Sequence, residues 1–520
     1  MLRRYLRPGR AIVLCLLLVA PLTVRPAVAA ETACDRLASL ALPASTVTSA
    51  IEVAAGRFPP EQAGGGQNAA LYKSLPAFCR VAATLRPSPD SDIRIEVWMP
   101  ASGWNGKFQA VGNGGWAGSI SYPAMARAVA RGYATASTDT GHRGGRADFA
   151  IGHPERLVDF AYRGVHEMTV RAKSVIEARY GAPPKLSYWN GCSTGGRQGL
   201  KEAQRFPQDF DGIIAGAPAN NWVNQKVAHI VVQQAFHKDP EADIPATKYP
   251  AMHKAVMQAC DALDGVTDGV LEDPRACRFD PGVLTCKGAD SASCLTPKQV
   301  ASARMLYSPV VHPRTRQQIF PGMVPGNEPD WAVAAGPEPR ETQIDLLTYV
   351  TYRDPKWDYR TFDLDSGLAL ALKRDAEGGT TAAVDPDLRP YVGRGGKLLL
   401  YHGWGDTNIM STNTVNYYTQ VVHALGGPEQ GGDAVRLFMV PGMEHCGGGV
   451  GTDSFDMMTA LERWVEQRSA PERIPASRVR NGVVERTRPL CRFPQVARYT
   501  GTGSTDDAAN FVCAAPRDPR

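Results

Sequence analysis

The stretch that most constrains the fold of this chain is Trp189-Asn190-Gly191-Cys192-Ser193-Thr194-Gly195-Gly196, which carries the pattern Gly-x-Ser-x-Gly. Residues 185–189 before it (KLSYW) form an apolar and aromatic run typical of a strand, and residues 194–206 after it place apolar side chains at helical spacing. A strand, a tight glycine turn and a helix are the setting of a nucleophile elbow, because the turn lifts the serine oxygen clear of the sheet. The pattern predicts Ser193 as a nucleophile.

Segments on both sides of the elbow alternate between strand and helix patterns. The expected strands are 93–100, 107–111, 133–140, 211–217, 396–403 and 435–440, and the expected helices are 165–180, 412–425 and 456–467. This alternation predicts an α/β fold with a mostly parallel sheet that helices cover on both faces. With the serine elbow, it indicates an α/β-hydrolase core.

The alternation stops after Pro218. Residues 220–384 hold four cysteines, many prolines and several aromatic residues without a regular strand and helix pattern. We interpret this segment as a large inserted lid domain, because insertions in α/β cores leave from the loops between strands and helices. The predicted catalytic domain then consists of residues 31–219 and 385–520.

Residues 1–30 have the layout of a secretory signal peptide. Arginines precede the apolar run 11–24, and Val28-Ala29-Ala30 offers small residues for cleavage. The run is short for a bilayer span, and no other apolar stretch reaches that length, so no membrane contact is expected once the segment is removed. Removal takes away five arginines and lowers the formal charge from +5 to about zero, which argues against a nucleic-acid partner. We expect a secreted or periplasmic protein; nothing in the sequence indicates an oligomeric state.

The cysteine count agrees with export. Ten of the eleven cysteines lie beyond residue 30. An even number in an exported chain is typical of disulfides, although the spacing alone leaves their connectivity open and buried free thiols are the alternative.

A serine nucleophile needs a general base and an acid that orients the base. In α/β-hydrolases both follow the serine, acid first, each on a loop after a strand. Asp406 follows the expected strand 396–403, and His445 follows the expected strand 435–440 through a Pro-Gly turn. His402 is the nearest rival for the base, but it precedes Asp406, so we interpret it as structural. The order predicts a Ser193, Asp406 and His445 triad.

Two cysteines adjoin this triad. Cys192 directly precedes Ser193, and Cys446 directly follows His445. If the serine and histidine are within hydrogen-bonding reach, the cysteines approach the distance of about 5.5 Å between Cα atoms that a disulfide requires. Such a bond would also exclude the competing hypothesis that Cys192 is a thiol nucleophile.

Two further stretches suggest binding sites. Residues 260–270 (CDALDGVTDGV) space three carboxylates by three and four residues, which suits a hard cation with oxygen ligands such as Ca²⁺, although an ordinary acidic surface loop is the alternative. Arg275 stands where an EF-hand would carry its bidentate Glu, so the stretch is not an EF-hand. The glycine cluster 112–115 follows an expected strand and would let backbone N–H groups approach a developing charge, unless it is only a loop.

Several motifs together resemble the tannase and feruloyl esterase family of secreted α/β-hydrolases. These motifs are Trp104-Asn105-Gly106, Gly191 to Gly196, Arg205-Phe206-Pro207, CDALDGVTDGV, Gly395-Gly396-Lys397, Val440-Pro441-Gly442-Met443, the doublets Cys192-Ser193 and His445-Cys446, and Arg488-Pro489-Leu490-Cys491. The resemblance implies the disulfides Cys34–Cys79, Cys192–Cys446, Cys260–Cys277, Cys286–Cys294 and Cys491–Cys513. It also implies a structural Ca²⁺ held by Asp261, Asp264 and Asp268 with the carbonyls of Val266 and Val270. The backbone N–H groups of Gly115 and Thr194 would be the oxyanion donors.

The expected activity is that of a serine carboxylesterase acting on small phenolic (hydroxycinnamoyl or feruloyl) esters. Aromatic residues in the predicted lid suit a flat acyl group, and Arg340 or Arg353 could meet an acid there. The alternatives are galloyl ester hydrolysis, as in a tannase, and hydrolysis of an aromatic diacid monoester. From another class, the chain could be a non-catalytic, calcium-stabilised protein that binds plant phenolics.

Overall fold

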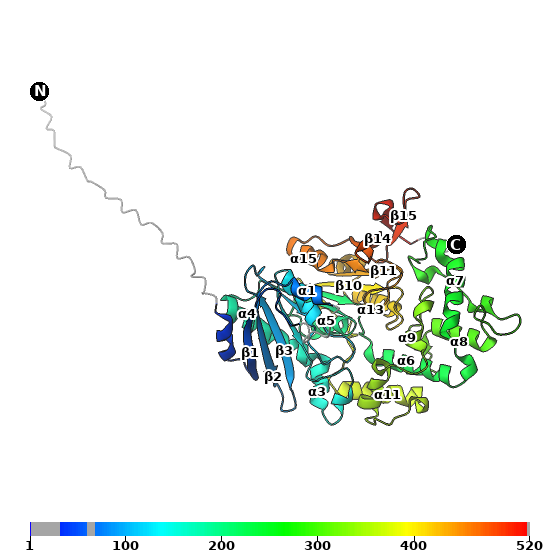
Figure 1. Ribbon diagram of the computed structural model, residues 1–520, viewed down its shortest axis with the longest axis horizontal. Helices are drawn as coiled ribbons and strands as arrows, with labels where there is room; N and C mark the ends of the chain where they lie inside the picture. The colour runs from blue at the N-terminus through cyan, green and yellow to red at the C-terminus, as the bar shows by residue number, and fades with distance from the viewer. Residues whose placement is uncertain (2–31, 60–67, 517–520) are drawn as a thin grey trace.

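A single large sheet runs through the core of the protein (Figure 1). The structure, a computed structural model, describes residues 1, 32–59 and 68–516. The predicted signal peptide therefore lies outside the described residues apart from Met1. Among the described residues, nine strands form this sheet in the order β1-β2-β3-β5-β4-β6-β7-β10-β11. Their bounds are β1 Ser45–Val53, β2 Phe78–Leu85, β3 Ile93–Pro100, β4 Lys107–Val111, β5 Ala134–Thr138, β6 Leu186–Cys192, β7 Gly212–Gly216, β10 Lys397–Gly403 and β11 Val435–Val440.

The sheet is parallel from β5 to β11 and antiparallel at its other edge. Parallel ladders join β5, β4, β6, β7, β10 and β11 in that order, whereas β1, β2, β3 and β5 pair antiparallel. The predicted α/β-hydrolase core with a mostly parallel sheet is confirmed. The strands β1 and β2 were not foreseen, and β5 lies between β3 and β4, which are neighbours in sequence. The carboxyl ends of the parallel strands meet at one edge, where loops after them can share a site.

Both faces of the parallel sheet are buried because the strands are apolar at successive positions. Leu398 and Leu400 belong to a cluster with side chains of α4 (Gly164–Tyr180), α5 (Thr194–Arg205) and α13 (Ser411–Ala424). Leu399, between them, packs on the other face with α2 (Tyr122–Ala130) and α15 (Met457–Gln467). A run such as Leu398-Leu399-Leu400 can be stable only between two helical layers.

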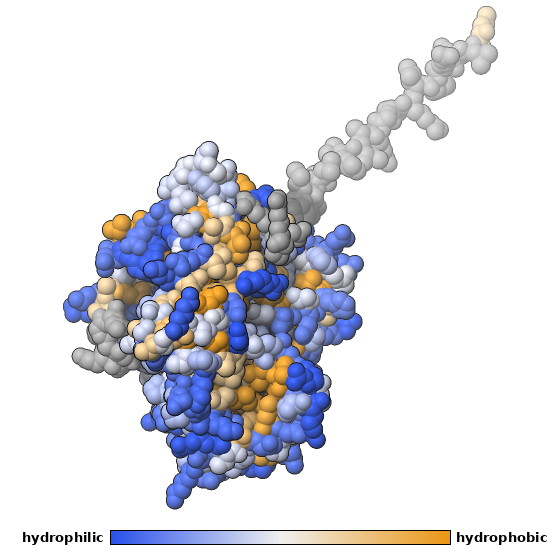
Figure 2. Space-filling view, turned by 90° about the vertical axis from the view of Figure 1, so that its right-hand side faces the viewer, coloured by the Kyte–Doolittle hydropathy of each residue, from blue (hydrophilic) through white to orange (hydrophobic). Residues whose placement is uncertain are grey.

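The segment between β7 and β10, which we call the inserted segment, adds no described strand to this sheet. It forms helices α6 Trp222–His237, α7 Tyr249–Cys260, α8 Pro297–Tyr307, α9 Ala332–Ala335, α10 Glu341–Asp345, α11 Leu364–Glu377 and α12 Arg389–Gly393, and the short strands β8 Val310–Val311 and β9 Gln318–Phe320. These helices gather on the side of the molecule opposite β1 (Figure 1). Seen from that side, apolar side chains form a band between hydrophilic margins (Figure 2). The limits of 220 and 384 for a lid domain stay a prediction.

The C-terminal part holds further strands that the sequence did not indicate. They are β12 Ser454–Phe455, β13 Arg473–Arg480, β14 Val483–Cys491, β15 Val496–Tyr499 and β16 Phe511–Ala514, in two small sheets. The short helices α1 Ala69–Lys73, α3 Pro154–Val158 and α14 Pro428–Gly432 complete the described α-helices. No described helix is both long and apolar enough to cross a membrane.

Candidate active site

The Gly-x-Ser-x-Gly stretch forms the turn between β6 and α5. Ser193 has φ 63° and ψ −121°, a left-handed backbone that few non-glycine residues adopt. Its N–H donates to the Gly216 carbonyl at 3.0 Å, which fixes the turn against the neighbouring strand. A Cβ on Gly191 would lie 2.5 Å from the Gly195 carbonyl oxygen, so both glycines are required for the close approach of helix to strand. This is the predicted elbow geometry, with Ser193 at its tip.

Asp406 and His445 come together at the ends of adjacent strands. Asp406 follows β10 and His445 follows β11, and these two strands pair in parallel. The Nδ1 of His445 donates to Asp406 Oδ2 at 2.7 Å, which leaves Nε2 as the nitrogen that can accept a proton. In the described chain the Ser193 hydroxyl donates to no protein acceptor. Such contacts are often long in a ligand-free enzyme and shorten when substrate binds.

The surroundings of Asp406 keep it ionised although it is 1% exposed. Burial by itself would raise its pKa, but the neighbouring His445 and hydrogen bonds from both histidines hold the pKa below its ordinary value. His402 Nε2 lies 3.0 Å from Asp406 Oδ2, and backbone N–H groups of Asn408 and Ile409 donate to Oδ1 at 2.8 and 2.9 Å. His402 is therefore a partner of the acid, a role that its position four residues before Asp406 could have suggested.

A disulfide joins the serine turn to the histidine loop. Cys192 and Cys446 are bonded with 6.1 Å between their Cα atoms, across 254 residues of sequence. Cys446 has φ 64°, so a residue on each of the two loops has a positive φ, which few non-glycine residues adopt. Cys192 is thus not a free thiol. The other four disulfides also join the pairs that the resemblance implies, Cys34–Cys79, Cys260–Cys277, Cys286–Cys294 and Cys491–Cys513.

Two backbone N–H groups are available beside the elbow. Thr194 is the first residue of α5, where helical N–H groups have no intrahelical acceptor. Its hydroxyl donates to the Gly115 carbonyl at 2.8 Å and so ties the glycine cluster to the elbow. Gly115 has φ 54°. Over residues 32–59 and 68–516, neither the Gly115 N–H nor the Thr194 N–H donates to a protein acceptor, as the predicted oxyanion donors require.

The inserted segment covers the site. A Cβ on Gly115 would lie 3.3 Å from Cγ2 of Thr342 in α10. Thr407, next to Asp406, donates to Asp330 Oδ2 at 2.6 Å. Burial raises the pKa of Asp330, and the nearby negative charge of Asp406 adds to the rise. Asp330 lies in a stretch where the sequence carried no recognisable motif, so it was not predicted.

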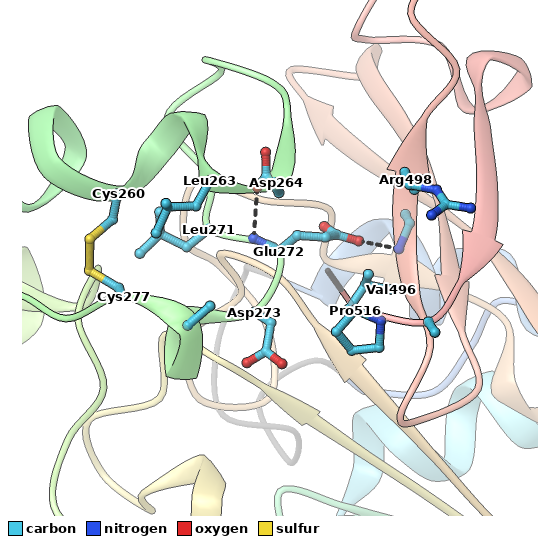
Figure 3. A pocket seen from close by; sticks show the side chains of 13 residues that line it. Cys260, Leu263, Asp264, Leu271, Glu272, Asp273, Cys277, Val496, Arg498 and Pro516 are labelled. Carbon is cyan, nitrogen blue, oxygen red and sulfur yellow. Dashed lines mark hydrogen bonds between the residues drawn. A yellow bond between two sulfur atoms is a disulfide. The ribbon is translucent and has the colours of Figure 1, made fainter. Parts of the chain in front are cut away.

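The acidic loop 261–272 lies elsewhere, where the inserted segment meets the C-terminal strands. Asp264 accepts hydrogen bonds from the N–H groups of Val266 and Glu272 at 3.0 and 3.1 Å, and Glu272 accepts from Ala497 N–H at 2.8 Å (Figure 3). A pocket of about 60 Å³ opens here, beside the Cys260–Cys277 disulfide. The loop is therefore tied to β15 as well as to α7.

The donor chemistry of this loop fits a hard cation. Burial, followed by repulsion from Asp268 and Asp261, raises the pKa of Asp264 to about 6, and burial raises that of Asp268 as well. Asp268 also contacts Arg488 and Arg486. Among described residues, the groups whose ligand atoms lie within 4.8 Å of one another do not include these aspartates. The carboxylates are thus partly paired with arginines, yet carry more negative charge than their neighbours balance.

A mostly parallel sheet that carries a serine elbow, an aspartate and histidine pair and free backbone donors at its carboxyl edge is that of an α/β-hydrolase. Comparison with known proteins identifies the family within this class. A profile of the family described as tannase and feruloyl esterase matches residues 79–514. The chain belongs to this family and is a carboxylic ester hydrolase.

Relatives along almost the whole chain agree with this assignment. An uncharacterized esterase of Xanthomonas campestris pv. campestris is 38% identical over 94% of this chain and 92% of its own length. A probable feruloyl esterase B-2 of Aspergillus terreus is 35% identical over 84% of this chain and 86% of its own length.

Solved structures show the same fold. The crystal structure of feruloyl esterase B from Aspergillus oryzae has a TM-score of 0.86 and 31% identity, and the match covers 92% of this chain and 99% of that one. Tannin acyl hydrolase from Aspergillus niger has a TM-score of 0.76 at 22% identity, with 92% of each chain covered, which supports the fold alone.

Proposed function

We propose that this protein is an exported serine carboxylesterase that hydrolyses esters of hydroxycinnamic acids such as ferulic acid, with Ser193, His445 and Asp406 as its triad. The observation that carries the proposal is the 2.7 Å hydrogen bond from His445 to Asp406 on the loop that Cys446 ties to the serine elbow. The proposed acyl preference rests on relatives, several of which are named as probable feruloyl esterases.

The chemistry follows from the positions of these groups. Ser193 attacks the ester carbonyl while His445 Nε2 takes its proton, and the same imidazolium then protonates the leaving alcohol. Asp406 holds the imidazole tautomer and balances its positive charge. The N–H groups of Gly115 and Thr194 stabilise the oxyanion of each tetrahedral intermediate. Water then attacks the acyl-enzyme by the same steps and releases the acid.

Calcium is proposed as a structural ion in the acidic loop. Asp261, Asp264 and Asp268 with the carbonyls of Val266 and Val270 would hold it, and a bound Ca²⁺ would offset the surplus negative charge of this loop. The loop also contacts β14 and β15, so an ion there would stabilise the junction between the inserted segment and the C-terminal strands. No step of the reaction requires it.

Export is proposed from the disulfides and the leader. Five disulfides indicate a chain that folds in an oxidising compartment. Residues 1–30 would direct it there and be removed. N-terminal sequencing of the protein recovered from the periplasm or medium should then begin near residue 31, whereas a retained Met1 would contradict the leader.

The catalytic proposal is tested with Ser193→Ala. This variant should keep the wild-type melting temperature and lose turnover by a factor of about 10⁵ or more, because it lacks the nucleophile. Labelling of wild-type Ser193 by a fluorophosphonate provides the direct measurement. Appreciable hydrolysis by the variant would remove Ser193 from its role. A panel of methyl ferulate, methyl gallate and mono(hydroxyethyl) terephthalate tests the acyl preference, and a clear preference for gallate would replace the feruloyl proposal.

A further inference from the structure

A buried lysine without a hydrogen-bonding partner lies in the cover of the active site. Lys226, on α6, is 3% exposed. Within the described chain its ammonium makes no hydrogen bond and no ion pair. It lies over the face of the Trp222 ring, 4.7 Å from the ring centroid. A buried ammonium normally has paired donors, because desolvation without compensation costs several kcal/mol. Lys226 therefore requires an explanation that packing does not supply.

The charged groups around Lys226 do not satisfy it. Asp345 is the acid that faces it, but both oxygens of Asp345 already accept from Arg146 and from the Ala147 N–H at 2.8 to 3.0 Å. Arg340 faces Lys226 with a second positive charge, and the buried imidazole of His229 lies on its own helix. Burial, with Arg340 next, lowers the pKa of Lys226 to about 7.

Other donors beside Lys226 also lack partners. The indole N–H groups of Trp116 and Trp222 are buried and make no hydrogen bond to described protein atoms, and their rings meet edge to face at 5.0 Å. His229 is 1% exposed, and burial lowers the pKa of its ring, with the Asn408 backbone as the nearest hydrogen-bonding group. Indole and ammonium groups can only donate. We call Trp116, Trp222, Lys226 and His229 the donor cluster, because three of its four members can only donate, while burial keeps the His229 ring neutral with one acceptor nitrogen.

The donor cluster lies on segments that are tied to the elements of the candidate active site. Trp116 directly follows the oxyanion residue Gly115. Ala219, just before α6, donates its N–H to the Ser193 carbonyl at 3.2 Å. Gln225, next to Lys226, donates to the Asn408 carbonyl at 2.9 Å, and Asn408 in turn donates to Asp406. An acyl group held at Ser193 therefore has the start of α6 as one wall.

We propose that the Lys226 ammonium binds an oxygen acceptor carried by the aromatic ring of the acyl group, at the end away from the ester carbonyl. This proposal deepens the esterase function and rests on Ser193 being its nucleophile. Phenolic hydroxyl and methoxy oxygens, or a ring carboxylate, share the required chemistry. Lys226 is accordingly a specificity-determining residue, which selects oxygen-substituted acyl rings over unsubstituted ones.

The test is a ratio of kcat/KM values. Methyl ferulate, methyl gallate and mono(hydroxyethyl) terephthalate are each compared with their ring-unsubstituted counterparts, methyl cinnamate and methyl benzoate. In the wild type at least one substituted ester should be preferred. In Lys226→Met that preference should fall about 10- to 100-fold, with cinnamate and benzoate little changed, because a charge-assisted hydrogen bond is lost only for the substituted ring.

The control is Lys248→Met. Lys248 is equally buried at 3% exposure in the same segment, but its ammonium is paired with Gln299 at 2.7 Å and with Asp290. This variant should lose thermal stability and keep the wild-type preference ratio. Lys226→Gln, which keeps a donor, should retain part of the preference, and it replaces Lys226→Met if the latter fails to fold.

The outcomes separate this proposal from the feruloyl one. If the terephthalate or gallate ester, and not ferulate, is strongly preferred over its unsubstituted counterpart and this preference depends on Lys226, the feruloyl assignment fails while the role of Lys226 is supported. An equal loss on substituted and unsubstituted esters, or no loss in Lys226→Met, overturns the role of Lys226. Inhibition by ferulate and cinnamate anions gives a readout that does not depend on turnover: the Ki for ferulate alone should rise in Lys226→Met.

Discussion

Two loops of this protein bury aspartates with opposite results. Asp406 in the catalytic loop and Asp264 in the acidic loop are both buried enough that desolvation raises their pKa. The net pKa of Asp406 nevertheless lies below its ordinary value, whereas that of Asp264 rises to about 6. The difference comes from partners, because His402 and His445 both contact Asp406, while Asp264 has backbone N–H donors and two acidic neighbours.

The two loops are also held by different disulfides. Cys192–Cys446 spans 254 residues and joins the serine turn to the histidine loop. Cys260–Cys277 spans only 17 residues and closes a local loop of the inserted segment. Around Asp406, two histidines of the protein itself stabilise the carboxylate, and a long-range disulfide holds the neighbouring loops together. In the acidic loop the protein leaves negative charge that a cation could offset. Burial alone therefore does not decide whether a carboxylate stays ionised; its hydrogen-bonding and charged partners do.

The largest effect is expected for Asp406→Asn. An amide there cannot balance the His445 imidazolium or fix its tautomer, so kcat should fall about 10³- to 10⁴-fold with a small change in KM. The matched variant Asp264→Asn should keep kcat and change the melting temperature. Steady-state kinetics and thermal melts of both variants measure this, and a large kcat loss in Asp264→Asn would break the distinction between the loops.

A smaller effect on turnover is expected when the long-range disulfide is removed. Cys192→Ser combined with Cys446→Ser leaves the nucleophile and base present but less well positioned, so kcat should fall about 10- to 100-fold while KM rises less. The melting temperature should also fall, since bonds closing loops of 100 residues contribute about 5 kcal/mol in chain-entropy estimates. The half-buried Cys286–Cys294 pair, replaced in the same way, serves as control. Wild-type kcat in the first variant would mean that the bond is structural only.

The acidic loop should respond to chelation. In a metal-replete sample, EDTA should lower the melting temperature, because the three aspartates then repel one another without a balancing ion. Arg488→Met removes a cation that contacts Asp268, so its loss on chelation should exceed that of the wild type. Differential scanning calorimetry measures both shifts. An unchanged wild-type melting temperature in EDTA would contradict a structural calcium ion.

The sequence predicted the parallel half of the sheet well and the edges poorly. The strand around Leu398-Leu399-Leu400 has three successive leucines, which marks a strand buried on both faces, and β10 forms there. β1 carries several exposed polar residues and β14 begins with the exposed residues 483–485, so single-sequence patterns did not separate them from loops. The triad of Ser193, Asp406 and His445 stays a prediction; the sequence could offer these residues because each follows a strong strand signal in a fixed order, and the structure brings His445 and Asp406 together.

Residues whose contacts depend on tertiary packing could not be predicted from sequence patterns in the same way. Asp330 reaches Thr407 from a segment without any motif. Lys226 stands in a largely apolar stretch of helix (WVNQKVAHIVV), where a fully buried lysine is unusual. That composition was the available signal, but only the fold shows that Asp345 is already paired with Arg146 and leaves Lys226 without an acid.

The smallest expected effect is on the pH dependence of stability, and it concerns a buried base, Lys226, instead of a buried acid. Burial lowers the pKa of Lys226 from 10.5 to about 7, so between these values the folded chain holds fewer protons than the unfolded chain. Wild-type stability should therefore rise with pH across this window, while Lys226→Met lacks the dependence. The variant should melt a few degrees higher than the wild type at pH 6, and the gap should narrow toward pH 10. Lys248→Met, which loses paired hydrogen bonds, should melt lower at both values. A gap for Lys226→Met that stays constant with pH would mean that the Lys226 ammonium is paired in the folded protein.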